Sequence, residues 1–257
     1  MTSVVFDNVS FGYDEKTILN DICLTIDGPG LVCILGPNGV GKTTLVKCIN
    51  KLLKPISGHV YFNGVDVQTM GRLDIARESA FVPNSSNSVF SMSVAEAILL
   101  GRHPHAGWVT SDKDIETVDH VIGLLGLEEF ADRDVRSLSA GQTQRVMIAR
   151  GLVQEPKVLI LDEPTSNLDV KYQMDVMRFL KAYAHDKGIL VIMVCHDLNI
   201  TAAYADRVIL MHGGKVFSDG PSSDVLTEDN IKTVYDVDAR VIEVEGSPHV
   251  VLIPKFD

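Results

Sequence analysis

The chain has 257 residues, of which 46% are hydrophobic and 22% are charged, and its formal net charge is −11. These proportions are typical of a globular protein that buries a substantial core, either as one domain or as one domain with a subdomain. The acidic charge argues against a general nucleic-acid binder and against direct docking on anionic lipid, because both need a basic surface.

The sequence also bears on the compartment. The first residues hold no basic stretch followed by an apolar core, so we expect no signal peptide. The longest apolar run, 189–195, is far shorter than the roughly 20 residues needed to cross a bilayer. The cysteines form no CxxC pair, and Cys33 and Cys195 lie in apolar runs, which is typical of buried free thiols in a reducing compartment. We expect a cytoplasmic chain that reaches a membrane only through a partner.

The N-terminal part of the chain predicts antiparallel strands, because apolar side chains at positions 4 and 6, and at 22, 24 and 26, alternate with more polar ones. A short apolar run at 31–35 predicts a buried strand that ends in a glycine-rich turn. Helical spacing follows over 45–53 and stops at Pro55. Residues 58–63 predict a strand that returns to the sheet.

The middle of the chain begins with a stretch rich in serine and asparagine, 84–93, which predicts an exposed loop. Ser93 and Glu96 have the spacing of a capping box, and apolar residues over 115–125 predict an amphipathic helix that ends at Gly126. Two buried parallel strands are predicted at 157–161 and 189–195, with a helix over 170–184 between them and a hairpin at 240–253. The sequence therefore predicts an α/β fold with a helical insertion.

A phosphate-binding loop is predicted where the strand at 31–35 ends, because the sequence there satisfies G-x-x-x-x-G-K-[ST]. Its residues are Gly36, Pro37, Asn38, Gly39, Val40, Gly41, Lys42 and Thr43, followed by Thr44 in the next helix. The glycines let backbone N–H groups curl around phosphate oxygens, and Lys42 adds a charge near the β and γ phosphates. The Thr43 hydroxyl can be placed on Mg²⁺, and we expect the following helix to present its positive N-terminal end to the phosphates.

Two carboxylates follow the strand predicted at 157–161. Asp162 and Glu163 emerge at the carboxyl edge of the sheet, where ligands bind in α/β proteins. We expect Asp162 to hold Mg²⁺, directly or through water. We expect Glu163 to orient and deprotonate an attacking water.

Further segments resemble the ABC ATPases, and the resemblance covers nearly the whole chain. The stretch LSAGQ at 138–142 resembles the LSGGQ signature, and SNLD at 166–169, which ends in Asp169, resembles the D-loop. His196 is similar to the switch histidine of the family. Tyr13 is similar in position to the aromatic residue that stacks on adenine, and Asn84 occupies the position of the Q-loop glutamine.

This resemblance implies a P-loop NTPase (RecA-like) core with an N-terminal antiparallel β subdomain and an inserted α-helical subdomain. It implies a single ABC ATPase domain over 1–257, in which 1–92 and 154–257 form the core with a C-terminal hairpin and 93–153 form the helical signature subdomain. The signature residues are Ser139, Ala140, Gly141 and Gln142. They would begin a helix that caps the γ phosphate of ATP on a second copy of the chain, in a two-fold homodimer.

The resemblance also assigns roles to single residues. His196 would hydrogen-bond the γ phosphate and hold the attacking water. Asn84 would contact the metal and couple the site to a membrane partner, with an amide one methylene shorter than glutamine. Ala140 replaces the first glycine of the signature pair, which is tolerable unless that position needs a positive φ.

The stretch LLGRHPH at 99–105 is similar to a segment of the ATPases that import iron–siderophore, haem and cobalamin complexes. The implied function is an ATP-hydrolysing subunit that powers uptake of such a chelate through a separate permease, with a substrate-binding protein acting indirectly. The region 84–105 would contact the permease at the inner face of the cell membrane. His103 and His105 lie in a predicted loop without further ligands, so we expect no metal site there.

Two other functions share these motifs. One is a soluble ABC ATPase, such as one of cofactor assembly; repair and chromosome members carry long coiled coils, and the insertion here has no sustained heptads. Translation members carry two cassettes, and this chain has one. The other is a regulatory nucleotide binder that does not hydrolyse ATP, which the presence of both Glu163 and His196 disfavours.

Overall fold

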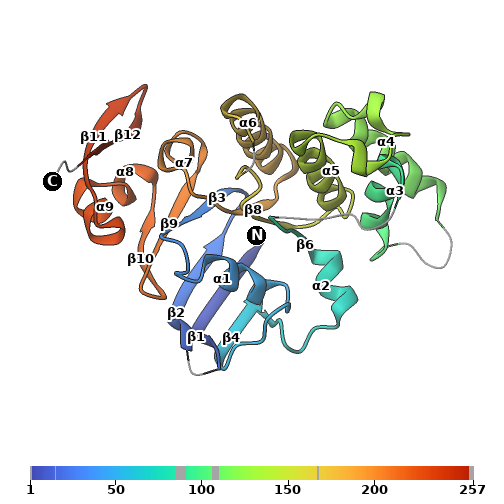
Figure 1. Cartoon of the computed structure of the whole chain (residues 1–257). Helices are drawn as coiled ribbons and strands as arrows, with labels where there is room; N and C mark the ends of the chain where they lie inside the picture. The colour runs from blue at the N-terminus through green and yellow to red at the C-terminus, as the bar shows by residue number, and fades with distance from the viewer. Residues whose placement is uncertain (1, 15, 85–90, 106–109, 167, 255–257) are drawn as a thin grey trace.

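The computed structural model describes residues 2–14, 16–84, 91–105, 110–166 and 168–254. These residues form two larger sheets with helices around them, and a two-stranded hairpin near the C-terminal end (Figure 1). Within the described ranges, no helix combines the length and the apolar character needed to span a bilayer. The exposed loop predicted at 84–93 lies mostly outside the described residues.

A four-stranded antiparallel sheet occupies the N-terminal part, in the order β2-β1-β4-β5. Its strands are β1 (Ser3–Tyr13), β2 (Lys16–Asp27), β4 (Ser57–Phe62) and β5 (Val65–Asp66). Side chains alternate between two faces along a strand, so the apolar positions of β1 and β2 share one buried face. Val4 lies opposite Ile26 and Phe6 lies opposite Leu24, which confirms the predicted antiparallel strands.

The central sheet has six strands in the order β10-β9-β3-β8-β7-β6, and all its neighbours are parallel except β10 and β9. Its strands are β3 (Gly30–Leu35), β6 (Ser79–Val82), β7 (Val158–Asp162), β8 (Leu190–Val194), β9 (Arg207–His212) and β10 (Lys215–Gly220). Strands β3, β7 and β8 are buried along their whole length, as expected for a parallel sheet covered on both faces.

The two faces of this sheet belong to two separate cores. Along β3, Cys33 and Leu35 join the core on the side of the long helices, whereas Val32 and Ile34 join the core shared with the antiparallel sheet. The period-two alternation of strand side chains produces this division. The sheet is thereby held rigidly, and the loops at its carboxyl edge are supported from both sides.

The helices lie mostly between or outside the sheets. They are α1 (Lys42–Ile49), α2 (Arg72–Glu78), α3 (Val94–Leu99), η1 (Leu100–Arg102), α4 (Asp112–Leu124), η2 (Glu128–Phe130), η3 (Val135–Ser137), α5 (Ala140–Leu152), α6 (Val170–Lys187), α7 (Leu198–Tyr204), α8 (Ser222–Val225) and α9 (Glu228–Tyr235). Figure 1 shows α3, α4 and α5 at one end of the molecule and the hairpin β11 (Asp238–Val244) and β12 (Ser247–Ile253) at the other. The predicted capping box at Ser93 and Glu96 is present at the start of α3.

The structure differs from the predicted elements in several places, and β6, β9, β10, α7, α8 and α9 are among the elements that were not predicted. The helix expected over 45–53 ends at Ile49, because Lys51 takes a left-handed φ of 54° and its ammonium group donates to the carbonyls of Gln68 and Met70. Helix α2, which has only one buried residue, Ile75, was not predicted. Its apolar side chains are too few to produce a helical period.

Candidate functional site

The candidate site forms at the carboxyl edge of the central sheet. Strand β3 pairs with β8, and β8 pairs with β7, all in parallel. The loops that follow these strands therefore lie next to one another. They carry the phosphate loop after β3, Glu163 after β7 and His196 after β8.

The phosphate loop depends on glycines with positive φ, at Gly36 (145°), Gly39 (78°) and Gly41 (106°). A Cβ added to Gly36 would lie 2.5 Å from the carbonyl oxygen of Met211, so only glycine fits there. The Lys42 ammonium donates to the carbonyl oxygens of Gly36 (2.7 Å) and Pro37 (3.0 Å), at the centre of the loop. Burial lowers the pKa of Lys42, although the nearby carboxylates of the site oppose that shift.

A cavity of about 290 Å³ lies over the loop. It is lined by Tyr13, Ile18, Asn38, Gly39, Gly41, Lys42, Thr43, Thr44 and Glu163. Tyr13 is 53% exposed, and its ring packs edge-on against Phe11 with centroids 5.0 Å apart. An aromatic ring held firmly by its neighbour and open on its outer side is suited to stacking on a base.

The remaining residues of the predicted loop lie close to this cavity. Pro37 and Val40 line an adjacent cavity of about 370 Å³, together with Asn38, Gly39 and Ile18. Ile18 was not predicted as a site residue. Its alternation with polar neighbours indicates only that it belongs to a strand.

A candidate metal position lies between α1 and β7. The Thr43 hydroxyl donates to Asp162 Oδ1 at 2.7 Å, and Asp162 is only 6% exposed. Burial raises the pKa of Asp162, which the hydrogen bond from Thr43 partly offsets. Among the described residues, no group of three or more His, Cys, Asp and Glu side chains is arranged to hold a metal alone. One carboxylate and one hydroxyl fit Mg²⁺, which usually takes its other ligands from phosphates and water.

Glu163 is the centre of a hydrogen-bonded group beside the cavity. Its Oε1 lies 2.5 Å from His196 Nε2, and its Oε2 accepts from Asn84 Nδ2 at 3.0 Å. The Ser166 hydroxyl donates to Asn84 Oδ1 at 3.0 Å and lies 3.1 Å from the carbonyl oxygen of Glu163. Glu163 has a φ of 52°, and such strain is typical of residues in functional sites. Its carboxylate is therefore held in one orientation by partners from two other strands.

The structure thus brings Asn84 to the carboxylate, and it adds Ser166 as a residue that orients Asn84. The only sequence feature that pointed to Ser166 was its place in the stretch at 166–169 that resembles the D-loop. Asn167, in the same stretch, lies outside the described residues.

The signature residues lie at the start of α5. Ser139 caps this helix and forms a capping box with Gln142, with backbone-to-side-chain distances of 2.9 and 3.3 Å. Ser139 and Ala140 are exposed, and Ala140 is not among the residues with positive φ, so alanine fits this position. Asp169 caps α6 by accepting from the Tyr172 N–H at 3.0 Å. None of these residues lines the cavity over the phosphate loop.

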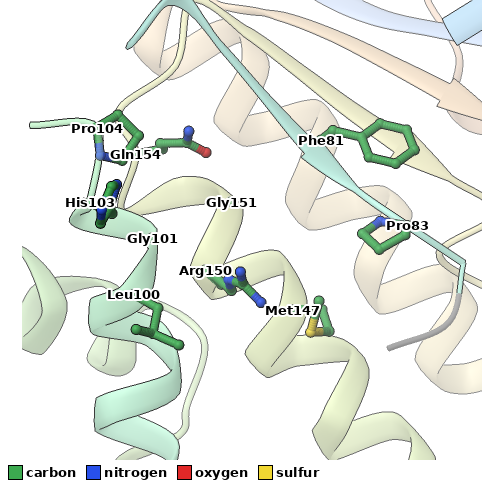
Figure 2. A pocket seen from close by; sticks show the side chains of 10 residues that line it. All are labelled: Phe81, Pro83, Leu100, Gly101, His103, Pro104, Met147, Arg150, Gly151 and Gln154. Carbon is green, nitrogen blue, oxygen red and sulfur yellow. The ribbon is translucent and has the colours of Figure 1, made fainter. Parts of the chain in front are cut away.

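A separate groove of about 580 Å³ lies at the other end of α5 (Figure 2). It is lined by Phe81, Pro83, Leu100, Gly101, His103, Pro104, Met147, Arg150, Gly151 and Gln154. Its walls are the end of β6, the last turns of α5 and the segment that includes η1. This segment lies so close to α5 that a Cβ added to Gly101 would be 2.2 Å from the carbonyl oxygen of Arg150.

Comparison with known proteins places these features in one family. The family model described as ABC transporter matches residues 19–166. The hemin import ATP-binding protein HmuV of Escherichia coli O157:H7 is 38% identical, over 95% of this chain and 97% of the relative. An uncharacterized ABC transporter ATP-binding protein of Methanocaldococcus jannaschii is 43% identical over 96% of both chains. The iron(3+)-hydroxamate import ATP-binding protein FhuC of Bacillus subtilis is 32% identical, over 94% of this chain and 91% of the relative.

Solved structures agree with these matches. One is cbiO1 of Clostridium perfringens, part of the ABC transporter complex cbiONQ, with a TM-score of 0.79 and 32% identity over 90% of this chain and 92% of that chain. A transporter assigned to the metal-chelate ABC type, in an inward-facing conformation, gives a TM-score of 0.85 and 25% identity over 100% and 98%. The matched residues include the phosphate loop, the signature and the acidic pair. The chain therefore belongs to the ABC transporter family, and it is an ATP-binding, ATP-hydrolysing protein of that family.

Proposed function

We propose that this ATPase powers the uptake of a metal chelate, of the iron–siderophore, haem or cobalamin type, through a separate membrane permease. The observation that carries the catalytic part is the placement of Glu163 beside the phosphate cavity, oriented by His196 and Asn84. The observation that supports the transport part is the groove beside Gly101, next to the segment that resembles chelate importers.

The nucleotide would lie with its base against Tyr13 and its phosphates in the loop that contains Lys42. Backbone N–H groups of the loop and the start of α1 would bind the phosphate oxygens. Lys42 would leave its carbonyl partners to contact the β and γ phosphates. Thr43 and Asp162 would hold Mg²⁺, which neutralises charge on the transferred phosphoryl group.

Glu163 is placed to accept a proton from an attacking water. Its carboxylate is oriented by two donors, so it loses little freedom when the water binds. His196 would turn toward the γ phosphate and hold the water, as the family resemblance implies. Asn84 would then couple the groove to the nucleotide site, because Phe81 and Pro83, which line the groove, precede it in the chain.

Two copies of the chain would enclose two ATP molecules. The exposed start of α5 does not contribute to its own cavity, and its capped N-terminus is an anion-binding end. In a two-fold dimer it would meet the γ phosphate on the other copy. The residues 93–153 would act as the signature subdomain in this closure, and the rest as the core.

The groove would receive a segment of the permease at the inner face of the membrane. It combines apolar side chains such as Phe81 and Met147 with the basic Arg150, so an amphipathic segment fits it. Relatives named for import of achromobactin, hemin, iron(3+)-hydroxamate and cobalamin suggest the class of cargo. A substrate-binding protein would act on the permease and never on this chain.

The catalytic proposal is tested with Glu163→Gln, examined by light scattering with and without Mg·ATP. We expect this variant to bind ATP, to hydrolyse it at least 100-fold more slowly than the parent, and to become a dimer when ATP is added. Glu129→Gln, an exposed residue of η2, is the control for loss of one charge. Turnover of Glu163→Gln at the parental rate would contradict the role given to Glu163.

The transport proposal is tested with a photo-crosslinking amino acid at position 103, in the groove, and at Lys171 on α6 as control. The experiment is carried out in cells of the source organism, and cross-linked partners are identified by mass spectrometry. A polytopic membrane protein captured at position 103 alone would support the permease. Capture of soluble proteins only would favour a cofactor-assembly ATPase instead.

A further inference from the structure

The C-terminal hairpin is joined to the helix that follows His196 by one side chain. Asn199 Oδ1 accepts from the Val250 N–H at 2.7 Å, and Asn199 Nδ2 donates to the Val250 carbonyl oxygen at 3.2 Å. The amide therefore occupies both hydrogen-bonding groups of one residue of β12, as a neighbouring strand would. Val250 itself is only 4% exposed and Asn199 is half-buried, so this connection is partly shielded from solvent.

The opposite edge of the hairpin is held in a similar way. Val241, which lies across from Val250, donates its N–H to Glu228 Oε1 at 3.2 Å. Glu228 is the first residue of α9. A two-stranded hairpin is marginal by itself, so these side chains and the packing against α7, α8 and α9 determine where it lies.

The residues 195–198, which we call the switch segment, lie at the start of α7, on the helix side of this connection. Asp197 caps α7 by accepting from the N–H groups of Asn199 and Ile200, at 2.8 and 2.9 Å. His196 immediately precedes this cap. The first turn of α7 is thus held both by Asp197 and, through Asn199, by β12, while the Cys195 N–H on the other side of His196 donates to the Ile34 carbonyl oxygen at 3.0 Å.

We propose that the segment 222–253 is a positioning element for ATP hydrolysis, in which Asn199 sets the residues 195–198 against β12. Asn199 does not line the nucleotide cavity; it acts through His196, which pairs with Glu163 of that lining. The inference rests on the proposed role of His196. It goes beyond that role by naming what holds the histidine and by connecting the site to a part of the chain more than 50 residues away.

The experiment uses the full-length chain and compares Asn199→Ala with Asn230→Ala. Asn230 Nδ2 donates to the Val225 carbonyl oxygen at 2.9 Å, so it makes a matched side-chain bond inside the same segment without reaching α7. Both variants are measured by steady-state ATP turnover and by hydrogen exchange of the amides at 195–198. We expect Asn199→Ala to lower kcat about fivefold, with KM within about twofold of the parent, and to speed exchange at 195–198. Asn230→Ala should lose stability but keep kcat and the slow exchange.

One further variant, His196→Ala, separates the possible failures. If His196→Ala retains turnover, the proposed role of His196 is wrong; if it abolishes turnover while Asn199→Ala behaves like Asn230→Ala, the positioning inference alone is wrong. Should Asn199→Ala fail to fold, Asn199→Leu, which keeps a side chain of similar size and lacks both hydrogen-bonding groups, takes its place, with the same result expected and the same result overturning the inference.

Discussion

Replacing Arg102 by methionine removes a buried charge that ties three parts of the helical region together. Arg102 is 4% exposed, and it donates to Asp114 Oδ1 (2.8 Å), to the Val153 carbonyl oxygen (2.7 Å) and to Glu155 Oε2 (2.7 Å). Methionine keeps the unbranched apolar stem and removes all the donors. The variant Arg102→Met therefore tests the hydrogen bonds and the charge more than the packing.

The magnitude follows from what is left behind. Removing one partner of a buried ion pair costs about 3–5 kcal/mol, because the other charge stays buried and unpaired. Glu155 is 55% exposed on its side chain, so its share is below about 1 kcal/mol. Asp114 keeps its bonds from the N–H and the hydroxyl of Ser111, at 3.0 and 2.7 Å, which reduces the loss. We expect Arg102→Met to lower the free energy of unfolding by about 3 kcal/mol.

The stability should also respond to pH in a way that identifies Asp114. Hydrogen bonds from Ser111 and Arg102 lower the pKa of Asp114 from 3.8 to about 2. Because the folded pKa is depressed, the stabilisation is complete above the unfolded value and is lost as pH falls through the folded one. The difference corresponds to about 2 kcal/mol, lost between about pH 4 and pH 2. Arg102→Met should show a shallower acid dependence in this window.

The assay is urea unfolding followed by circular dichroism at pH 7 and pH 3, with Asp114→Asn and the double variant completing a cycle. We expect a coupling free energy of at least about 1 kcal/mol, because neutralising Asp114 relieves the charge stranded by Arg102→Met. Additive losses, or a loss below about 1 kcal/mol for Arg102→Met, would refute the reasoning. ATP affinity should stay at the parental value, since Arg102 does not line the nucleotide cavity.

Three other predictions follow from single contacts. Asp162→Asn should raise the Tm of the nucleotide-free chain at pH 7 by roughly 2–4 °C and abolish turnover. Burial raises the pKa of Asp162, so the ionised carboxylate destabilises the fold at neutral pH. Calorimetry that shows an unchanged or lower Tm would contradict this. Gly101→Ala should lower the free energy of unfolding in urea by about 1–3 kcal/mol, because its Cβ would lie 2.2 Å from the Arg150 carbonyl oxygen. In the control Gly123→Ala, the Cβ would meet nothing closer than 3.7 Å, so we expect no loss. Tyr13→Ala should weaken ATP binding about tenfold by titration calorimetry and leave tripolyphosphate binding unchanged, because in the proposed binding mode the ring would contact only the base. Equal weakening of both ligands would argue against stacking.

Much of the candidate site was predictable because its motifs are local. The order of glycines, Lys42 and Thr43 determines a backbone path and a charge within a few residues, whatever surrounds them. The same holds for Asp162 and Glu163, where a run of apolar residues followed by acids predicts both a buried strand and an edge position. The Ser139 and Gln142 capping box is likewise written into a spacing of three.

The contacts between distant segments were not predictable in this way. Asn84 and Glu163 are 79 residues apart, and a shift of one strand in the sheet order would separate them. The end of α1 depends on Lys51, whose ammonium donates to the carbonyl oxygens of Gln68 and Met70. The pairing of Asn199 with β12 left no pattern in the sequence, because a single amide has no period.

The sequence by itself determined which chemical groups this protein offers: a phosphate-loop motif, two adjacent carboxylates and a signature-like stretch, each encoded by neighbouring residues whose local backbone and charge do not need the rest of the chain. Only the tertiary structure decided how these groups are oriented and what holds them. The orientation of Glu163 by His196 and Asn84, the groove next to Gly101 and the connection from Asn199 to the hairpin all require strands and helices to meet across long separations. These long-range contacts form because the two cores are buried and because the parallel strands take this order, and both are properties of the whole fold.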